Sequence, residues 1–196
     1  MLPEASMGPT GKESSLRSFT SSVVKRKVCL VGEEEVGKTS LIRRFVTGEF
    51  DEAYVRTLGA VVSKKSLSLD TTEGRVRVDM LVYDITGKRT FLELFRDAYL
   101  KGVAGVLAVF DMTRRRTLVD LAPWIDGVLR EAGSIPVLAL GNKSDLQDRI
   151  EVQAEDIDSV LGPRKVGVVR TSAKTGVRVE DAFLRLARDM LLASHR

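Results

Sequence analysis

The sequence predicts an α/β domain in which helices cover both faces of a mostly parallel, six-stranded sheet. From Arg26 onward, β-branched runs alternate with segments of helical period, which is typical of this architecture. Two short runs, Val106–Phe110 and Ile135–Leu140, are continuously apolar, as strands buried on both faces should be. The segment Val179–Met190 places its apolar residues on one stripe with charged residues opposite, which predicts a helix packed on the sheet.

The remaining elements follow from the same patterns. Helical spacing returns in the segment that holds Leu118 and Leu129, and Pro123 should start or kink that helix. A hairpin with alternation at period two, turning near Gly74, adds one antiparallel pair. The expected strands are Lys27–Val31, Val61–Leu69, Arg75–Tyr83, Val106–Phe110, Ile135–Leu140 and Val166–Arg170, and the first helix spans about Lys38–Thr47.

Composition limits the chain to one ordinary core. With 196 residues, of which 43% are hydrophobic, it has the size of a single domain. The formal net charge is +4, and basic and acidic residues are interleaved along the chain, so we expect no nucleic-acid partner. We interpret the short basic run Arg114–Arg116 as a solvated loop edge. The one cysteine, Cys29, should pack as a small hydrophobe. No apolar stretch approaches the roughly 20 residues that span a bilayer, and we expect a cytoplasmic monomer.

The N-terminal segment differs in composition from the rest of the chain. Up to about Ser22 it is rich in Ser, Gly and Pro and has neither helical nor strand period. We therefore divide the chain into a flexible extension, residues 1–25, and one domain, residues 26–196. A transit peptide is the alternative for the extension, although Glu4 and Glu13 break the acid-poor pattern of such peptides.

A phosphate-binding loop follows the first strand. The residues from Gly32 to Thr39 read GEEEVGKT, which satisfies G-x-x-x-x-G-K-[ST] between a strand and a helix. Backbone N–H groups would converge on the phosphates, Lys38 would add a point charge, and the Thr39 hydroxyl would ligate Mg²⁺. We expect the three adjacent glutamates of this loop to point into water. The expected phosphate-side residues are Glu34, Glu35, Val36, Gly37, Lys38, Thr39 and Ser40.

Two later loops predict a guanine site. Asp145, in the run Asn142-Lys143-Ser144-Asp145, can accept from the ring N–H and the exocyclic amine of guanine, a donor pair that adenine lacks. Such a site rejects the wrong base by large factors. In the run Thr171–Lys174, a backbone N–H can meet the guanine carbonyl. The expected base-side residues are Asn142, Lys143, Asp145, Leu146, Ser172, Ala173 and Lys174.

The γ-phosphate and the metal have their own candidates. Asp84 ends a hairpin strand and can hold Mg²⁺ through water, while the Gly87 N–H would face the γ-phosphate. Thr57 would offer a second hydroxyl to Mg²⁺ when the γ-phosphate is present, and loss of that contact would release its loop. The expected catalytic residues are Lys38, Thr57, Gly87 and Lys88.

These five elements, in this order over Lys27–Leu192, closely resemble the Ras superfamily of small GTPases, and the Rab branch in particular. Three segments are similar to stretches of Rab sequences: GKTSLIRRF from Gly37, YVRTLG from Tyr54 and AYLKG from Ala98. The resemblance implies a P-loop NTPase fold of the small G-domain type that binds GTP or GDP with Mg²⁺. It also implies effector, exchange-factor and activating proteins as partners, with a role in vesicle trafficking.

The resemblance assigns further roles. Phe50 would pack edge-on against guanine, Lys143 would stack across its face, and Tyr54 would close over the phosphates. Switch I would span about Phe50–Gly59 and switch II about Ile85–Ala98. Family members carry C-terminal prenylated cysteines, but this chain ends without cysteine, and Leu2 does not suit N-myristoylation, so we expect no lipid anchor.

Two of the positions that depart from the family pattern bear on the rate of hydrolysis. Lys88 stands where members carry the Gln that orients the attacking water, and an ammonium has no acceptor, so we expect slow GTP hydrolysis. The alternative is that Lys88 neutralises transition-state charge. Glu34 stands where an activating protein's arginine needs a small side chain. A slow hydrolase and a GTP-loaded scaffold thus both remain open, while Asn142–Asp145 argues against a nucleotide kinase.

Overall fold

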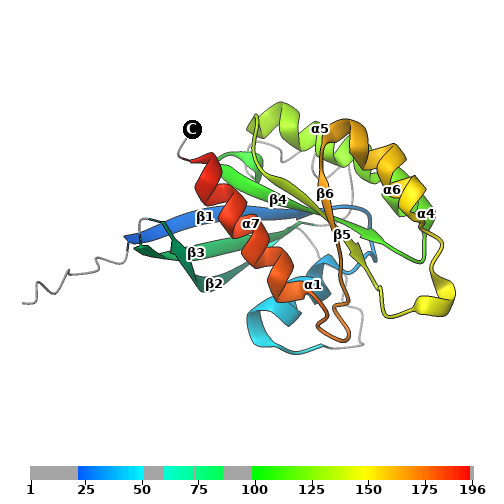
Figure 1. The fold of residues 1–196 in the computed structure, drawn as a ribbon, viewed down its shortest axis with the longest axis horizontal. Helices are drawn as coiled ribbons and strands as arrows, with labels where there is room; N and C mark the ends of the chain where they lie inside the picture. Colours follow the sequence, from blue (N-terminus) through cyan, green and yellow to red (C-terminus); the bar gives the residue numbers. More distant parts are fainter. Residues whose placement is uncertain (1–21, 51–59, 73, 86–98, 195–196) are drawn as a thin grey trace, which may run out of the picture.

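The computed structural model describes residues 22–50, 60–72, 74–85 and 99–194 (Figure 1). Its strands form one six-stranded sheet in the order β2-β3-β1-β4-β5-β6. Only β2 and β3 pair antiparallel, and every other neighbouring pair is parallel, which confirms the predicted fold class. The strands are β1 Ser22–Val31, β2 Ala60–Thr71, β3 Gly74–Ile85, β4 Val103–Asp111, β5 Val137–Asn142 and β6 Gly167–Arg170.

Helices cover both faces of this sheet. Side chains of α1 and α7 pack on one face, and those of α4, α5 and α6 pack on the other. In Figure 1, α7 crosses the sheet, and α4, α5 and α6 lie together at the upper right. The helices are α1 Lys38–Thr47, α4 Arg115–Val119, α5 Leu121–Ala132, α6 Ala154–Leu161 and α7 Val179–Ala193, with the 3₁₀ turns η1 Gln147–Arg149 and η2 Gly162–Arg164. Among the described residues, no helix combines the length and apolar character needed to cross a membrane.

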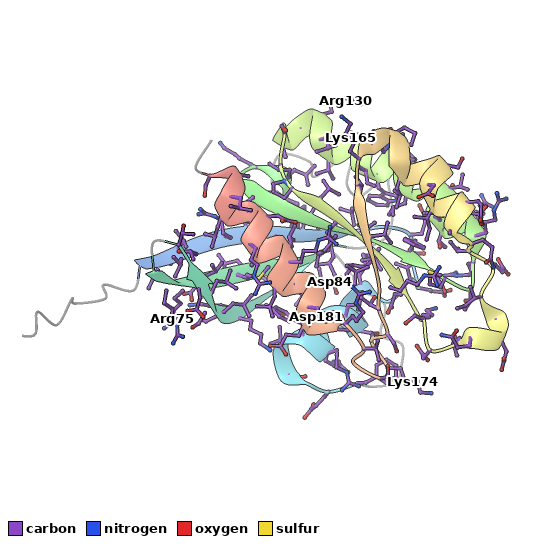
Figure 2. The ribbon with its side chains drawn as sticks, in the orientation of Figure 1. Arg75, Asp84, Arg130, Lys165, Lys174 and Asp181 are labelled. Carbon is purple, nitrogen blue, oxygen red and sulfur yellow. The ribbon has the colours of Figure 1, made fainter. Side chains whose placement is uncertain are left out.

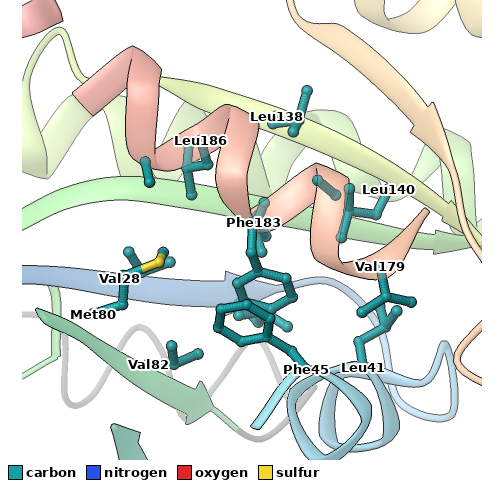
Figure 3. Packing of buried hydrophobic residues seen from close by; sticks show 14 of the residues in the cluster. Val28, Leu41, Phe45, Met80, Val82, Leu138, Leu140, Val179, Phe183 and Leu186 are labelled. Carbon is teal, nitrogen blue, oxygen red and sulfur yellow. The ribbon is translucent and has the colours of Figure 1, made fainter. Parts of the chain in front are cut away.

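The central strand β1 divides its side chains between the two layers. Val28 and Leu30 pack with α1 and α7, whereas Cys29 packs in the opposite layer. Burial raises the pKa of the Cys29 thiol to about 12, so this side chain behaves as the small hydrophobe that we expected. In the first layer, the rings of Phe45 and Phe183 stack with centroids 3.8 Å apart (Figure 3). This stack joins α1, the helix that follows the phosphate loop, to α7.

All six strands differ from their predicted bounds, and the differences at β1 and β5 are the most informative. Strand β1 begins at Ser22 rather than Lys27, and residues 22–25 pair with β3. Assigning those residues to the extension was therefore wrong, since β3 is long enough to keep pairing with them. Strand β5 begins at Val137 rather than at Ile135. Pro136 lies between these two residues and has no N–H to give to a ladder.

Pro123 occupies the place that its chemistry favours. Helix α4 ends at Val119 and α5 begins at Leu121, so Pro123 lies in the first turn of α5. A missing N–H is harmless there, because the first N–H groups of a helix have no intrahelical acceptor. The prediction that Pro123 would start or kink a helix is confirmed.

Candidate functional site

The loop between β1 and α1 needs glycine at both ends of its motif. Gly32 has a φ of 133°, and a Cβ atom there would lie 2.2 Å from the Val109 carbonyl oxygen. Gly37 has a φ of 98°, and its Cβ atom would lie 2.3 Å from Nδ2 of Asn142. Any larger residue would collide with β4 or with the end of β5. These contacts bring the loop against the carboxyl ends of the central strands, where ligands of α/β sheets bind.

The Lys38 side chain folds back over the loop. Its Nζ atom donates to the carbonyl oxygens of Gly32 and Glu33, both at 2.8 Å. Burial lowers the pKa of Lys38 to about 8, against the opposing charges of Asp84, Glu33 and Glu34. A buried ammonium group is therefore held within the curve of the loop, where it would contact the oxygens of a bound phosphate.

Glu33 departs from the expectation that the glutamates of the loop point into water, whereas Glu35 keeps an exposed side chain. Oε1 of Glu33 accepts from Nε1 of Trp124 on α5 at 2.9 Å. Oε2 of Glu35 lies 3.5 Å from Nη1 of Arg114. These partners turn two carboxylates toward α5 and α4, away from the curve of the loop. These two pairs could not be predicted from the sequence, because the partners in each pair are far apart along the chain.

A hydroxyl and a carboxylate meet beside the loop. Thr39, in the first turn of α1, donates through Oγ1 to Oδ2 of Asp84 at 2.5 Å. Asp84 lies near the end of β3 and is buried, and Figure 2 labels it close to α1. Both oxygens are hard ligands of the kind that Mg²⁺ prefers, together with phosphate and water. The residues present thus fit a magnesium site.

Asn142 ties the phosphate loop to the base-side loop. It ends β5 and is 1% exposed. Its Nδ2 donates to the Val36 carbonyl at 2.9 Å, and its Oδ1 accepts from the Ala173 N–H at 3.1 Å. The sequence placed Asn142 among the nucleotide contacts, whereas in the structure its side chain joins two loops of the site.

The base-side loops hold each other through Asp145. Its Oδ1 accepts from Oγ of Ser172 at 2.6 Å, and that Oγ accepts from the Thr175 N–H at 3.0 Å. The Ser144 N–H donates to the Thr171 carbonyl at 3.0 Å. Asp145, the expected guanine-reading carboxylate, is thereby oriented by a serine of the second motif.

Lys143 is anchored by a residue that sequence reasoning missed. Its Nζ lies 2.7 Å from Oδ2 of Asp111, at the end of β4. Oδ1 of Asp111 accepts from the N–H and the hydroxyl of Thr113 at 2.9 and 2.8 Å. Burial opposes ionisation of Asp111, but its hydrogen bonds from Lys143 and Thr113 outweigh burial and lower its pKa. The signal was available in the topology, because Asp111 and Asn142 pair at the ends of adjacent strands.

Arg44 is a second residue that the sequence did not reveal. On α1, it donates from Nε to the Ala173 carbonyl at 2.8 Å and from Nη2 to the Lys174 carbonyl at 2.5 Å. Figure 2 labels Lys174 in the loop that precedes α7. Arg44 thus fixes the backbone of the second base-side loop to the helix that follows the phosphate loop.

The basic run Arg114–Arg116 lies at a solvated edge, and each of its side chains also has a carboxylate partner. Arg114 donates from Nε to Asp111 at 3.0 Å, and Arg115 and Arg116 form ion pairs with Asp156 and Asp120. The exposed side chains of Arg115 and Arg116 fit the predicted solvated edge, whereas Arg114 is half-buried and is held by Asp111.

Some of the other predicted site residues lie in the described part of the chain, and the rest lie outside it. Phe50 is partly buried and packs against the core layer of α1 and α7. Ser40 is partly buried in the first turn of α1, and the Leu146 N–H donates to the Lys143 carbonyl at 3.1 Å. The residues that lie outside the described part are Tyr54, Thr57, Gly87 and Lys88, with most of both predicted switches.

The comparisons with known proteins cover nearly all of this architecture. A family model described as the Ras family matches residues 27–192. Ras-related protein Rab-13 of Rattus norvegicus is 32% identical over 167 residues, which is 85% of this chain and 80% of the relative. Rab-13 of Bos taurus is 32% identical over 169 residues, 86% of this chain and 81% of the relative. The match to the family begins in β1 and ends in α7.

Proposed function

Because the chain belongs to the Ras family and is a Rab-like small GTPase, we propose that the described site binds GTP and GDP with Mg²⁺ and that two switch segments report which is bound. One observation carries the proposal. The Asn142 side chain connects the phosphate loop at Val36 to the base-side loop at Ala173. A phosphate cradle and a base-reading carboxylate are thus parts of one connected site.

The proposal assigns a role to each of the main site residues. Lys38 supplies positive charge to the β and γ phosphate oxygens, and backbone N–H groups of the loop complete the cradle. Asp145 accepts two N–H bonds from guanine, and Ser172 fixes the orientation of that carboxylate. The stem of Lys143, held at its end by Asp111, forms a surface for the face of the base.

The metal would be held by Thr39 and by Asp84 through water, with Thr57 added in the GTP state. The bound ion would neutralise phosphate charge. Since Thr57 and Gly87 lie in the predicted switches, their contacts to the γ side distinguish GTP from GDP. Phe50 and Tyr54 would close the site over the base and the phosphates.

The proposed hydrolysis is slow. Lys88 replaces the family Gln and offers three donors but no acceptor to the attacking water. Glu34 adds a second obstacle, since it occupies the position where an activating protein's arginine needs space. The same two residues favour a second candidate, a GTP-loaded scaffold with negligible hydrolysis.

Two measurements test the proposal. The nucleotide that co-purifies with the protein is released by denaturation and identified by chromatography; GTP would favour the scaffold, GDP the hydrolase, and an adenine nucleotide would contradict both. Single-turnover GTP hydrolysis is then compared between wild type and Lys88→Gln. We expect the substitution to raise the rate, and a faster wild type would refute the assigned role of Lys88.

Partners follow from the same family membership. We propose that effector, exchange-factor and activating proteins bind through the switches. The likeness to Rab proteins supports a role in vesicle trafficking.

A further inference from the structure

Arg114 reaches three groups at once from the turn between β4 and α4. Its Nε donates to Oδ2 of Asp111 at 3.0 Å, and its Nη2 donates to the Glu34 carbonyl at 3.2 Å. Its Nη1 lies 3.5 Å from Oε2 of Glu35. A planar guanidinium makes these contacts from one rigid fork, which an ammonium cannot do. Arg114 therefore joins the backbone and a side chain of the phosphate loop to the end of β4.

The same carboxylate oxygen also holds the base-side loop. Nζ of Lys143 lies 2.7 Å from Oδ2 of Asp111, the atom that accepts from Arg114. Asp111 is 1% exposed and its other oxygen is fixed by Thr113. Because Arg114 and Lys143 contact the same oxygen, a shift of either side chain changes the position that the other prefers.

The charges indicate what loss of Arg114 would do. A buried carboxylate that loses every cation is strongly destabilising. Without Arg114, Asp111 still has Lys143 as a cation, so the fold is expected to persist. The ammonium of Lys143, already 2.7 Å from Oδ2 of Asp111, would then shift toward the side of the carboxylate that Arg114 had occupied, and its stem would leave the place required by the base. The phosphate loop would meanwhile lose its contacts at Glu34 and Glu35.

We propose that Arg114 is a positioning residue for the bound nucleotide: through Asp111 it fixes the phosphate loop and Lys143 relative to each other and slows nucleotide release. The inference rests on the proposed function and adds a residue and a route to it. Arg114 itself does not contact the nucleotide in this account. Its contacts lie on the outer side of the loop, so GDP and GTP are affected alike.

The test measures release of fluorescently labelled GDP and GTP, chased with excess unlabelled nucleotide in magnesium buffer. Arg116→Gln is the matched control, because Arg116 belongs to the same run but its side chain is 91% exposed and, within the described part of the chain, forms its ion pair with Asp120 on the same helix face. Arg114→Gln should accelerate release of both nucleotides by about tenfold, and Arg116→Gln by less than about twofold. Arg114→Lys should fall between wild type and Arg114→Gln, and it serves as the test variant if Arg114→Gln is not recovered folded.

A second readout separates positioning from general stability. If Arg114 acts through the carboxylate that also holds Lys143, its effect must depend on that carboxylate. In an Asp111→Asn background, which leaves no buried charge without a cation, Arg114→Gln should therefore accelerate release by less than about threefold. Multiplicative effects of the two substitutions would contradict the route through Asp111.

The failures are distinguishable. If the wild type retains no labelled guanine nucleotide, the proposed function itself is wrong. If the wild type retains it and both Arg114 variants release it at the wild-type rate, only the positioning role is wrong.

Discussion

The side-chain amide of Asn142 lies 2.9 Å from the carbonyl oxygen of Val36, in a contact closed to solvent. Val36 is in the phosphate loop, and Asn142 ends the fifth strand and also accepts from the base-side loop. The Asn142 side chain, which has four heavy atoms, thereby sets the spacing between the phosphate loop and the base-side loop. These two loops are proposed to bind opposite ends of one nucleotide.

Asn142→Ala should weaken binding of GDP and GTP equally. It leaves the buried Val36 carbonyl and Ala173 N–H without their partner, and an unsatisfied buried group costs about 1–3 kcal/mol. We expect at least about a tenfold increase in the dissociation constants, measured by displacement of labelled GDP. Gln147→Ala is the control, since exposed Gln147 bonds the Ser144 carbonyl from the solvent side. Equal affinities in Asn142→Ala and wild type would contradict the bridging role.

Gly37→Ala and Gly48→Ala separate crowding from backbone strain. Both glycines have positive φ, 98° and 78°, but only a Cβ at Gly37 meets another atom, Nδ2 of Asn142 at 2.3 Å. A Cβ at Gly48 would meet no atom of the described residues within 4 Å. Gly48→Ala should lower the free energy of unfolding by about 1 kcal/mol and leave nucleotide affinity unchanged. Gly37→Ala should in addition weaken nucleotide binding, and titrations that show equal affinity for the two variants would count against the close approach.

Lys38 should make nucleotide affinity depend on pH. Burial lowers its pKa to about 8 from an ordinary value of 10.5. Between these values the unfolded chain binds the proton and the folded chain does not, so stability without nucleotide rises with pH through this window. Phosphates favour the ammonium form, so binding takes up a proton above about pH 8 and GDP affinity falls as the pH rises.

Titrations with GDP from about pH 7 to about pH 9 check this expectation. Wild type should show constant affinity up to about pH 8 and a decline of at most about tenfold per pH unit above it. Lys38→Met should bind weakly with no such decline. A decline of the same size in Lys38→Met would assign the dependence to another group.

The fold could be predicted from the sequence because its signals are local. The continuous apolar run ending at Leu140 and the stripe of α7 each need only their own residues to be recognised. The glycine-flanked motif around Lys38 likewise identifies itself by its spacing between a strand and a helix. The start of β1 was missed because residues 22–25 join the sheet through pairing with β3, which no local pattern reports.

The supporting residues of the site could not be predicted, because their partners are far away in sequence. Trp124 is separated from Glu33, and Arg44 from Ala173, by most of the domain. Asp111 directly follows the predicted strand Val106–Phe110 and belongs to no motif, so its role emerges only when β4 and β5 end side by side. The chemistry of the ligand can thus be inferred from motifs, while the interactions that orient those motifs require the fold.

Competition between GTP and ATP, measured with magnesium on wild type and Asp145→Asn, tests the central claim most directly. The carboxylate of Asp145 is expected to accept both guanine donors, and a site of this kind rejects a base that lacks them by roughly 10⁴-fold. Wild type should therefore bind GTP tighter than ATP by that order, and Asp145→Asn should lose most of the preference, because its amide replaces one acceptor with a donor. If ATP competes as well as GTP for the wild-type protein, the assignment of this site to guanine nucleotides is wrong.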